Sequence, residues 1–259
     1  MYRALMSCTF KQQFTYRASL YIRIIGSIIR VYIQVCIWHV LLKTGVPVSQ
    51  TAEQLVTYTV YAFLIGQVTR NNTAQALATK VKDGSISIDL IRPFPLKWYL
   101  FYQQLSENMF NFLFVGVPVA LVSAVFWSMQ MPGVMQLAFG LVCLVLAVFL
   151  TFMFQYVVGL LVFYFRDVTY TRMITGGIVE LFSGSMIPLW FYPEVLRNIC
   201  MFMPFRFMVF EPISVFLGSY GSADCVSVLL IQLFWVVALA LLGEFIWKRI
   251  QKNITIQGG

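Results

Sequence analysis

Six apolar stretches separated by short polar segments take up most of this 259-residue chain. An α-helix that crosses a bilayer needs about 20 mainly apolar residues. Backbone amides in lipid must be paired within their own segment, and the alternating pattern of a barrel is absent, so the spans are predicted to be helices. The predicted spans cover about 20–42, 52–70 (the most polar), 103–128, 134–164, 173–188 and 226–247.

Three further segments complete the predicted all-α membrane fold. Residues 1–17 repeat apolar positions at helical spacing beside three cations, which is typical of a helix lying in the membrane interface. Residues 188–225 contain four prolines yet stay apolar, so two short re-entrant helices dipping into the outer leaflet are predicted, with a surface loop as the alternative. Residues 70–97 form a basic segment, and a short helix is predicted over about 84–92. We expect one domain over 1–259.

Composition indicates that lipid is the solvent of this chain. Sixty per cent of the residues are hydrophobic and 11% are charged, against about 25% charged in soluble domains. The net charge of +8 is compatible with nucleic-acid binding, but about thirteen of the eighteen Lys and Arg fall on one side of the predicted topology. This bias predicts that both termini are cytoplasmic, and no nucleic-acid partner is expected.

Few residues are available for metal or disulfide chemistry. The chain has one histidine and five cysteines without a CxxC pair, so no metal site is expected. A disulfide between Cys200 and Cys225 and a pair of buried free thiols remain open alternatives.

The basic segment carries a pattern typical of a docking helix. Asp83 or Ser85 can cap a short helix, and Pro93 ends it because the residue before proline avoids the α region. Ile86 and Leu90 share one face at the i, i+4 spacing, and Ile91 lies beside them. Such a face fits a hydrophobic cleft on a soluble partner, and a helix resting on lipid headgroups is the alternative.

Polar residues inside the spans are costly and are therefore functional candidates. Arg23 and Arg30 lie two turns apart on the first span; Arg23 can reach the inner headgroups, while Arg30 needs a partner. These groups either fasten helices as ion pairs or line a translocation path. Glu107, Asn108, Asn111 and Glu180 could each line that path or pair with Arg30. Ser183 and Ser185 are small residues that either allow close helix packing or line the path.

Several motifs carry a resemblance to one family. The stretch Lys82-Asp-Gly-Ser-Ile-Ser-Ile-Asp-Leu-Ile-Arg-Pro-Phe-Pro95 resembles the coupling-helix region of type-2 ATP-binding-cassette exporter permeases, in the compact bacterial branch associated with antibiotic and drug export. Arg166-Asp167 resembles a cytoplasmic turn of that family, and Ser183-Gly-Ser-Met-Ile-Pro-Leu-Trp-Phe-Tyr-Pro193 resembles its outer segment. The order of elements is similar over nearly the whole chain.

The resemblance implies a non-catalytic permease subunit in the bacterial cytoplasmic (inner) membrane. It implies pairing with a second permease, identical or a sister chain, and with two ATP-binding-cassette ATPase subunits that bind ATP and Mg; no cofactor is expected in this chain. Consistent with this, the sequence has no GxxxxGK[ST] phosphate-binding loop. The expected ATPase-docking residues are Asp83, Gly84, Ile86, Ile88, Asp89, Leu90, Ile91, Arg92 and Pro93, with Arg166 and Asp167 close to the ATPase.

The leading functional hypothesis is ATP-driven export of an amphipathic drug, antibiotic, peptide or lipid. Export of lipid-linked polysaccharide is the nearest alternative. An intramembrane enzyme is disfavoured, because no HExxH motif and no paired base and nucleophile are present. A secondary transporter or channel would often show inverted repeats, and none is visible in the sequence.

Overall fold

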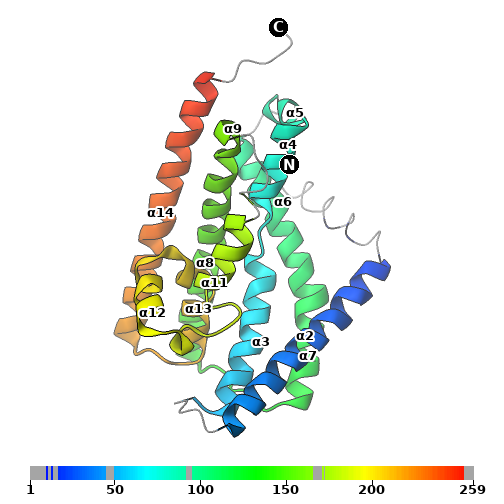
Figure 1. Ribbon diagram of the computed structural model, residues 1–259, viewed down its shortest axis with the longest axis vertical. Coiled ribbons are helices and arrows are strands. Elements are labelled where there is room, and N and C mark those ends of the chain that lie inside the picture. Colours follow the sequence, from blue (N-terminus) through cyan, green and yellow to red (C-terminus); the bar gives the residue numbers. More distant parts are fainter. Residues whose placement is uncertain are drawn as a thin grey trace.

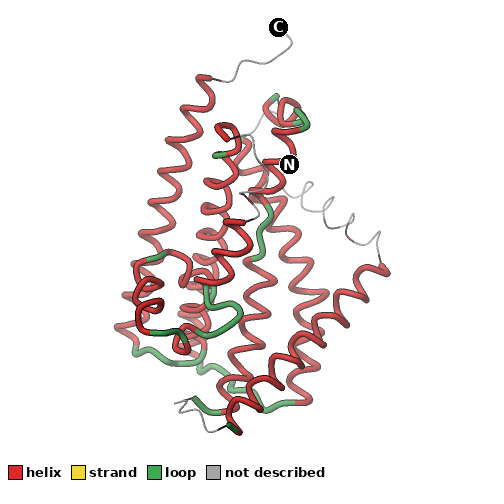
Figure 2. The backbone as a smooth tube through the Cα atoms, in the orientation of Figure 1, coloured by secondary structure: helices red, strands yellow, loops and turns green. Residues whose placement is uncertain are grey.

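The computed structural model describes residues 10, 13, 17–44, 50–91, 95–165, 171 and 173–253. Every regular element in these ranges is a helix, which confirms the predicted all-α class (Figure 2). The predicted interfacial helix over 1–17 falls almost wholly outside the described residues. The same holds for four predicted site residues, Arg92, Pro93, Arg166 and Asp167.

Four helical stretches in the described part of the chain are long and apolar enough to cross a membrane. They coincide with the first, third, fourth and sixth predicted spans, so the chain is a multi-pass membrane protein. The elements that form them are α2 (Arg17–Lys43), the continuous α6 (Leu96–Asn111), η1 (Phe112–Gly116) and α7 (Val117–Phe126), then α8 (Val134–Leu160) with α9 (Val162–Phe165), and α14 (Ser222–Asn253).

The second predicted span is a single helix, α3 (Ala52–Thr69). Its first turn is closed by a reciprocal cap: the Gln54 backbone N–H donates to the Thr51 hydroxyl at 3.2 Å, and the Thr51 N–H donates to the Gln54 side-chain oxygen at 3.0 Å. This cap fixes where α3 begins.

The fifth predicted span is shorter than expected. Its helical part comprises η2 (Met173–Ile178) and α11 (Val179–Phe182), and ends well before residue 188. Gly184 turns the chain with φ +74°, where a Cβ would also lie 3.1 Å from the Phe210 Cβ and from the Tyr58 hydroxyl. Only glycine fits this left-handed, crowded turn. The predicted span 173–188 is mainly apolar, but the left-handed turn at Gly184 ends its helix early.

Helix α8 packs against α14, α4 (Thr73–Lys82) and α13 (Phe210–Phe216), as the layout in Figure 1 allows. Two glycines of α8 permit these close approaches, as small residues do between membrane helices. A Cβ on Gly140 would lie 2.4 Å from the Phe216 ring, and one on Gly159 would lie 3.0 Å from the Ala74 Cα. Gln232 of α14 donates to the backbone oxygens of Cys143 and Phe207, both at 3.0 Å. These contacts fasten α8 to its neighbours.

The segment after α11 contains four short helical elements, where two were predicted for 188–225. It comprises η3 (Leu189–Phe191), α12 (Glu194–Phe202), η4 (Pro204–Met208) and α13 (Phe210–Phe216). Arg206 and Glu211 form an ion pair at 3.1 Å, in which the Glu211 side chain is 1% exposed. Cys200 and Cys225 are both buried free thiols, so the open disulfide alternative is not realised. The depth of this segment in a leaflet stays a prediction.

The basic segment folds as two helices, α4 (Thr73–Lys82) and α5 (Ile86–Leu90). In Figure 1 they lie at the same end of the bundle as the last turns of α14, and opposite the α7–α8 loop. Leu77 and Ala78 of α4 are fully buried. The segment after α3 is therefore a packed part of the bundle.

Candidate functional site

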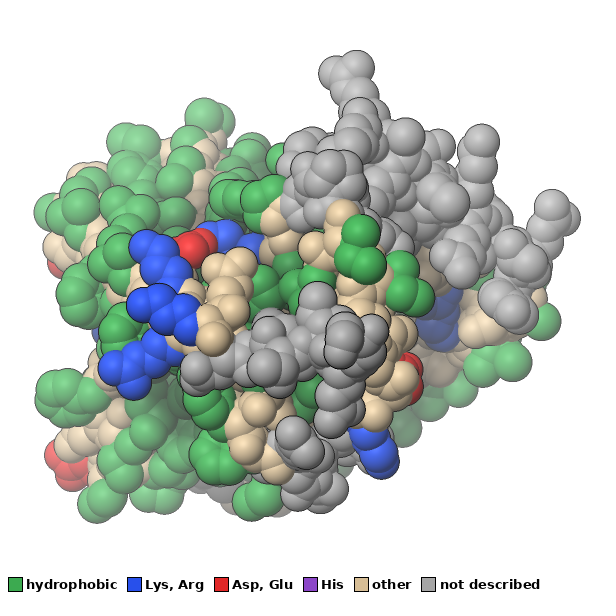
Figure 3. Space-filling view, turned by 90° about the horizontal axis from the view of Figure 1, so that it is seen from above, with side chains coloured by type: hydrophobic (Ala, Val, Ile, Leu, Met, Phe, Trp, Pro, Cys, Tyr) green, Lys and Arg blue, Asp and Glu red, His purple; other side chains and the backbone are tan. Residues whose placement is uncertain are grey.

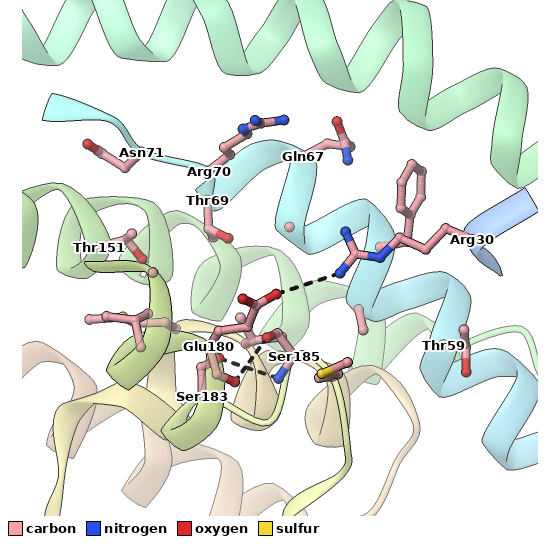
Figure 4. Close-up of a pocket in the computed structure, with 18 of the residues that line it drawn as sticks. Arg30, Thr59, Gln67, Thr69, Arg70, Asn71, Thr151, Glu180, Ser183 and Ser185 are labelled. Carbon is pink, nitrogen blue, oxygen red and sulfur yellow. Dashed lines mark hydrogen bonds and ion pairs between the residues drawn. The ribbon is translucent and has the colours of Figure 1, made fainter. Parts of the chain in front are cut away.

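A cavity with polar and apolar walls opens between α2, α3, α8 and the η2–α11 segment (Figure 4). Its volume is about 490 Å³. It extends along α3 from Tyr58 to Thr69, a rise of about 17 Å, and continues to Asn72. Polar side chains gather at the C-terminal end of α3, where Gln67, Arg70 and Asn71 line the wall. Aromatic and apolar side chains line the other half, among them Trp38, Tyr58, Phe63, Met186 and Met208.

Arg30 and Glu180 form an ion pair at this cavity, between α2 and α11. The distance between the Arg30 Nη2 and the Glu180 Oε1 is 3.6 Å, and both side chains are exposed, at 71% and 54%. Figure 4 shows Arg30 reaching from α2 toward Glu180. Of the partners predicted for Arg30, the structure therefore brings Glu180 to it.

Ser183 and Ser185 also line the cavity. The Ser185 backbone N–H donates to the Ser183 hydroxyl at 3.3 Å, and the Ser185 hydroxyl donates to the Glu180 backbone oxygen at 3.3 Å. These bonds hold the turn that follows α11 beside the cavity.

Arg23 and Asn111 lie apart from the cavity wall and bind each other. The Arg23 Nη1 donates to the Asn111 Oδ1 at 2.8 Å, and the guanidinium lies over the Phe110 ring at 6.0 Å. The pair connects α2 to α6, so its role in the structure is to fasten helices. Glu107 is half-buried on α6 near Arg70 and is also absent from the cavity lining.

Asn108 is absent from the cavity lining and bonds inside the bundle instead. Its side-chain NH₂ donates to the Val68 backbone oxygen at 2.5 Å, and the NH₂ of Gln104 donates to the Arg70 backbone oxygen at 3.1 Å and to the Asn108 Oδ1 at 2.9 Å. The last carbonyls of a helix lack partners within it. Both side chains are buried, and they satisfy the end of α3 inside the bundle. Gln104 was missed, although it lies four residues before Asn108 on the same helix face.

We expect Asn108→Leu to lower the free energy of unfolding by about 2 kcal/mol, because it leaves the Val68 carbonyl without its partner. Thermal unfolding of the purified chain in detergent measures this loss. Gln103→Leu, at a half-buried position on the same helix, is the matched control. Equal unfolding temperatures for the two variants would contradict the assignment.

The apolar face predicted for docking points into the protein. Ile86 is 9% exposed and Leu90 packs against the same core cluster, whereas Ile88 and Ile91 are 63% and 81% exposed. Helical periodicity does place Ile86 and Leu90 together, but Asp89 lies on their side. Lys80 of α4 forms an ion pair with Asp89, which holds that side against the bundle. Among the described residues of this segment, the exposed large apolar side chains are therefore Ile88 and Ile91.

The turn before α5 is built differently from the predicted helix cap. Ser85 precedes α5 without a side-chain cap bond. Instead, the Asp83 carboxylate accepts from the Ser85 hydroxyl at 2.7 Å and from the Ser85 N–H at 2.9 Å. These bonds lower the pKa of Asp83 from its ordinary value. Gly84 has φ +77°, which glycine adopts readily and which reverses the chain between α4 and α5.

Cations gather at the same end of the molecule. Figure 3 looks onto this end and shows Lys and Arg side chains grouped on one side. The last turns of α14 contribute Lys248, Arg249 and Lys252, all exposed. Lys97 at the start of α6 forms an ion pair with Glu244 of α14.

Among the described residues, no cluster of three or more His, Cys, Asp or Glu is placed to hold a metal ion.

Comparison with known proteins identifies the family of this chain. The model of the ABC-2 family transporter proteins matches residues 28–258. No curated protein matches the chain. The match includes the cavity, the α4–α5 segment and most of the residues in all four candidate spans. The chain therefore belongs to the ABC-2 family of transporter proteins and is a membrane permease of an ABC exporter.

Proposed function

We propose that this permease exports an amphipathic substrate across the bacterial cytoplasmic membrane and is driven by separate ATPase subunits that bind α5. The observation that carries the proposal is the exposure of Ile88 and Ile91 on a short helix whose other side is fixed to the bundle. Paired apolar side chains on a rigid protrusion are suited to a cleft on a soluble partner.

Packing connects this protrusion to the cavity. The α5 helix is held to α4 by the Lys80–Asp89 ion pair, and α4 packs on α8 at Gly159. Gln155 and Thr151, one and two turns earlier on α8, line the cavity. A force applied to α5 is therefore transmitted through contiguous contacts to the cavity wall. In the proposed cycle, ATP binding by the partners moves α5 and changes access to the cavity.

The proposed assembly contains a second permease, identical or a sister chain, and two ATPases. ATP and Mg²⁺ bind in the ATPases, and this chain acts as a non-catalytic subunit. Both termini lie in the cytoplasm, on the side of the cationic end of α14. The amphipathic character of the cargo is supported by the two halves of the cavity, one polar and one aromatic. A lipid-linked polysaccharide is the alternative cargo.

Reconstitution tests this function. The chain is co-expressed with candidate ATPases, purified as a complex and placed in vesicles that contain a panel of fluorescent amphiphiles. We expect movement of at least one amphiphile to require ATP, and to be absent when the ATPase carries a substitution that prevents hydrolysis. Transport by the chain without an ATPase, driven by an ion gradient, would instead favour a secondary transporter.

A further inference from the structure

The cavity lining contains more positive than negative side chains. Among the residues that line it, Arg30 and Arg70 are cationic and Glu180 is anionic. Arg30 is paired with Glu180, so Arg70 supplies the excess positive charge. Arg70 interacts electrostatically with Glu107 and with Arg23, which have opposite signs, so these two groups leave its positive charge in place. The polar half of the cavity is therefore cationic.

The side-chain oxygen of a buried glutamine in the same cavity has no hydrogen-bond partner among the described residues. Gln155 is 4% exposed and lines the cavity, and its Oε1 has no partner among the described residues. Buried polar groups are nearly always paired, so an unpaired one marks a position that a ligand can satisfy. The amide oxygen accepts hydrogen bonds, so it suits a head group that carries a hydroxyl beside its charge.

The other half of the cavity suits a hydrocarbon or aromatic tail. Trp38 stacks on Phe191 with ring centroids 5.3 Å apart, and Tyr58 meets Trp190 edge to face at 5.0 Å. These contacts fix two aromatic walls, and Met208 lies against the same space. Rigid aromatic side chains provide apolar contact area at a low entropic cost.

The opening of the cavity is bordered by apolar surface. Arg30 and Glu180 are both more than half exposed there, and Met186 is 59% exposed. On α2 the neighbouring residues Ile29 and Ile33 are exposed as well. An amphiphile dissolved in the bilayer can therefore reach the cavity from the side, with its head group meeting the Arg30–Glu180 pair first.

We propose that the cavity binds an amphiphile with an anionic head group that also carries a hydroxyl, such as a phosphate monoester, whose O–H can donate to the Gln155 Oε1. The head group lies against Arg70 and Gln155, and the tail lies between Trp38 and Tyr58. This inference rests on the proposed transport function and names the substrate class of the same cavity. Glu180 neutralises Arg30 until the ligand arrives, so removing the Glu180 charge raises the attraction for anions.

The test is equilibrium binding to the purified full chain in nanodiscs of zwitterionic lipid, without any ATPase. The probes are a fluorescent dodecyl phosphate and the matching dodecyl trimethylammonium, each corrected for binding to empty nanodiscs. We expect tighter binding of the phosphate probe. Arg70→Gln should weaken that binding about tenfold, as the loss of one charge-assisted hydrogen bond does. Glu180→Gln should strengthen it, a gain that misfolding cannot produce.

Arg197→Gln, at an exposed arginine of α12 remote from the cavity lining, is the matched control and should leave both affinities unchanged. Equal affinity for the two probes would overturn the inference, and so would identical behaviour of Arg70→Gln and Arg197→Gln. Either failure would leave ATPase-driven transport standing, because no ATPase enters this experiment. Loss of ATPase association, in turn, would not alter these affinities.

Discussion

Ile88→Asp combined with Ile91→Asp is expected to abolish co-purification with the partner ATPase and ATP-driven transport, while the permease still inserts and folds. Both side chains are exposed in the isolated chain, so their replacement costs the fold little. Burying an isoleucine at an interface contributes about 2 kcal/mol, and the two together correspond to an affinity loss of about a thousandfold. Burying the new carboxylates without partners weakens the complex further.

Two controls separate docking from folding. Val195→Asp changes an apolar residue of α12 that is 73% exposed at a distance from α5, and should leave ATPase binding intact. Ile86→Asp places a charge at a buried position, and should instead lower the yield of folded permease. Normal ATPase recovery with the double variant would refute the assignment of Ile88 and Ile91.

Gly159→Leu is expected to have the largest effect on the fold. A Cβ at this position would lie 3.0 Å from the Ala74 Cα and 3.1 Å from the Leu77 Cδ2, and the Ala74 backbone cannot move without displacing α4. Overpacking of this kind costs about 3 kcal/mol. We expect a lower unfolding temperature in detergent and, in complexes that do assemble, ATP hydrolysis that no longer drives transport, because α4 connects α5 to α8.

The matched control is Gly26→Leu, which makes the same substitution on membrane helix α2, where an added Cβ meets nothing within 4 Å. It should leave both the unfolding temperature and coupled transport close to those of the unchanged chain. Wild-type transport by Gly159→Leu would show that close α4–α8 packing is not needed for coupling.

Composition and apolar length predicted the membrane class and located the four long spans, because crossing lipid imposes a length and a backbone requirement on each helix. The fifth span was overestimated. Hydropathy does not register the left-handed turn at Gly184, which stops the helix inside an apolar run. Local sequence patterns therefore predicted the type of each element more accurately than the residue at which it ends.

Site features that depend on local sequence periodicity could be predicted, whereas those that depend on contacts between residues far apart in the sequence could not. The shared face of Ile86 and Leu90 followed from periodicity, but its inward direction depends on the Lys80–Asp89 ion pair between two helices. The pairing of Arg30 with Glu180 joins residues 150 positions apart, and the sequence left it as one option among several. Asn108 looked like a path residue because a buried polar side chain in a span has the same sequence signature whether it meets a substrate or a helix end.

The most direct test of α5 as the attachment point of the motor is photo-crosslinking in the assembled transporter. A benzoylphenylalanine is placed at position 88, with position 195 on α12 as the control site. We predict an ATP-binding-cassette ATPase as the crosslinked product from position 88 and none from position 195. Crosslinks from position 88 to lipid alone, in complexes that hydrolyse ATP and transport normally, would contradict the account.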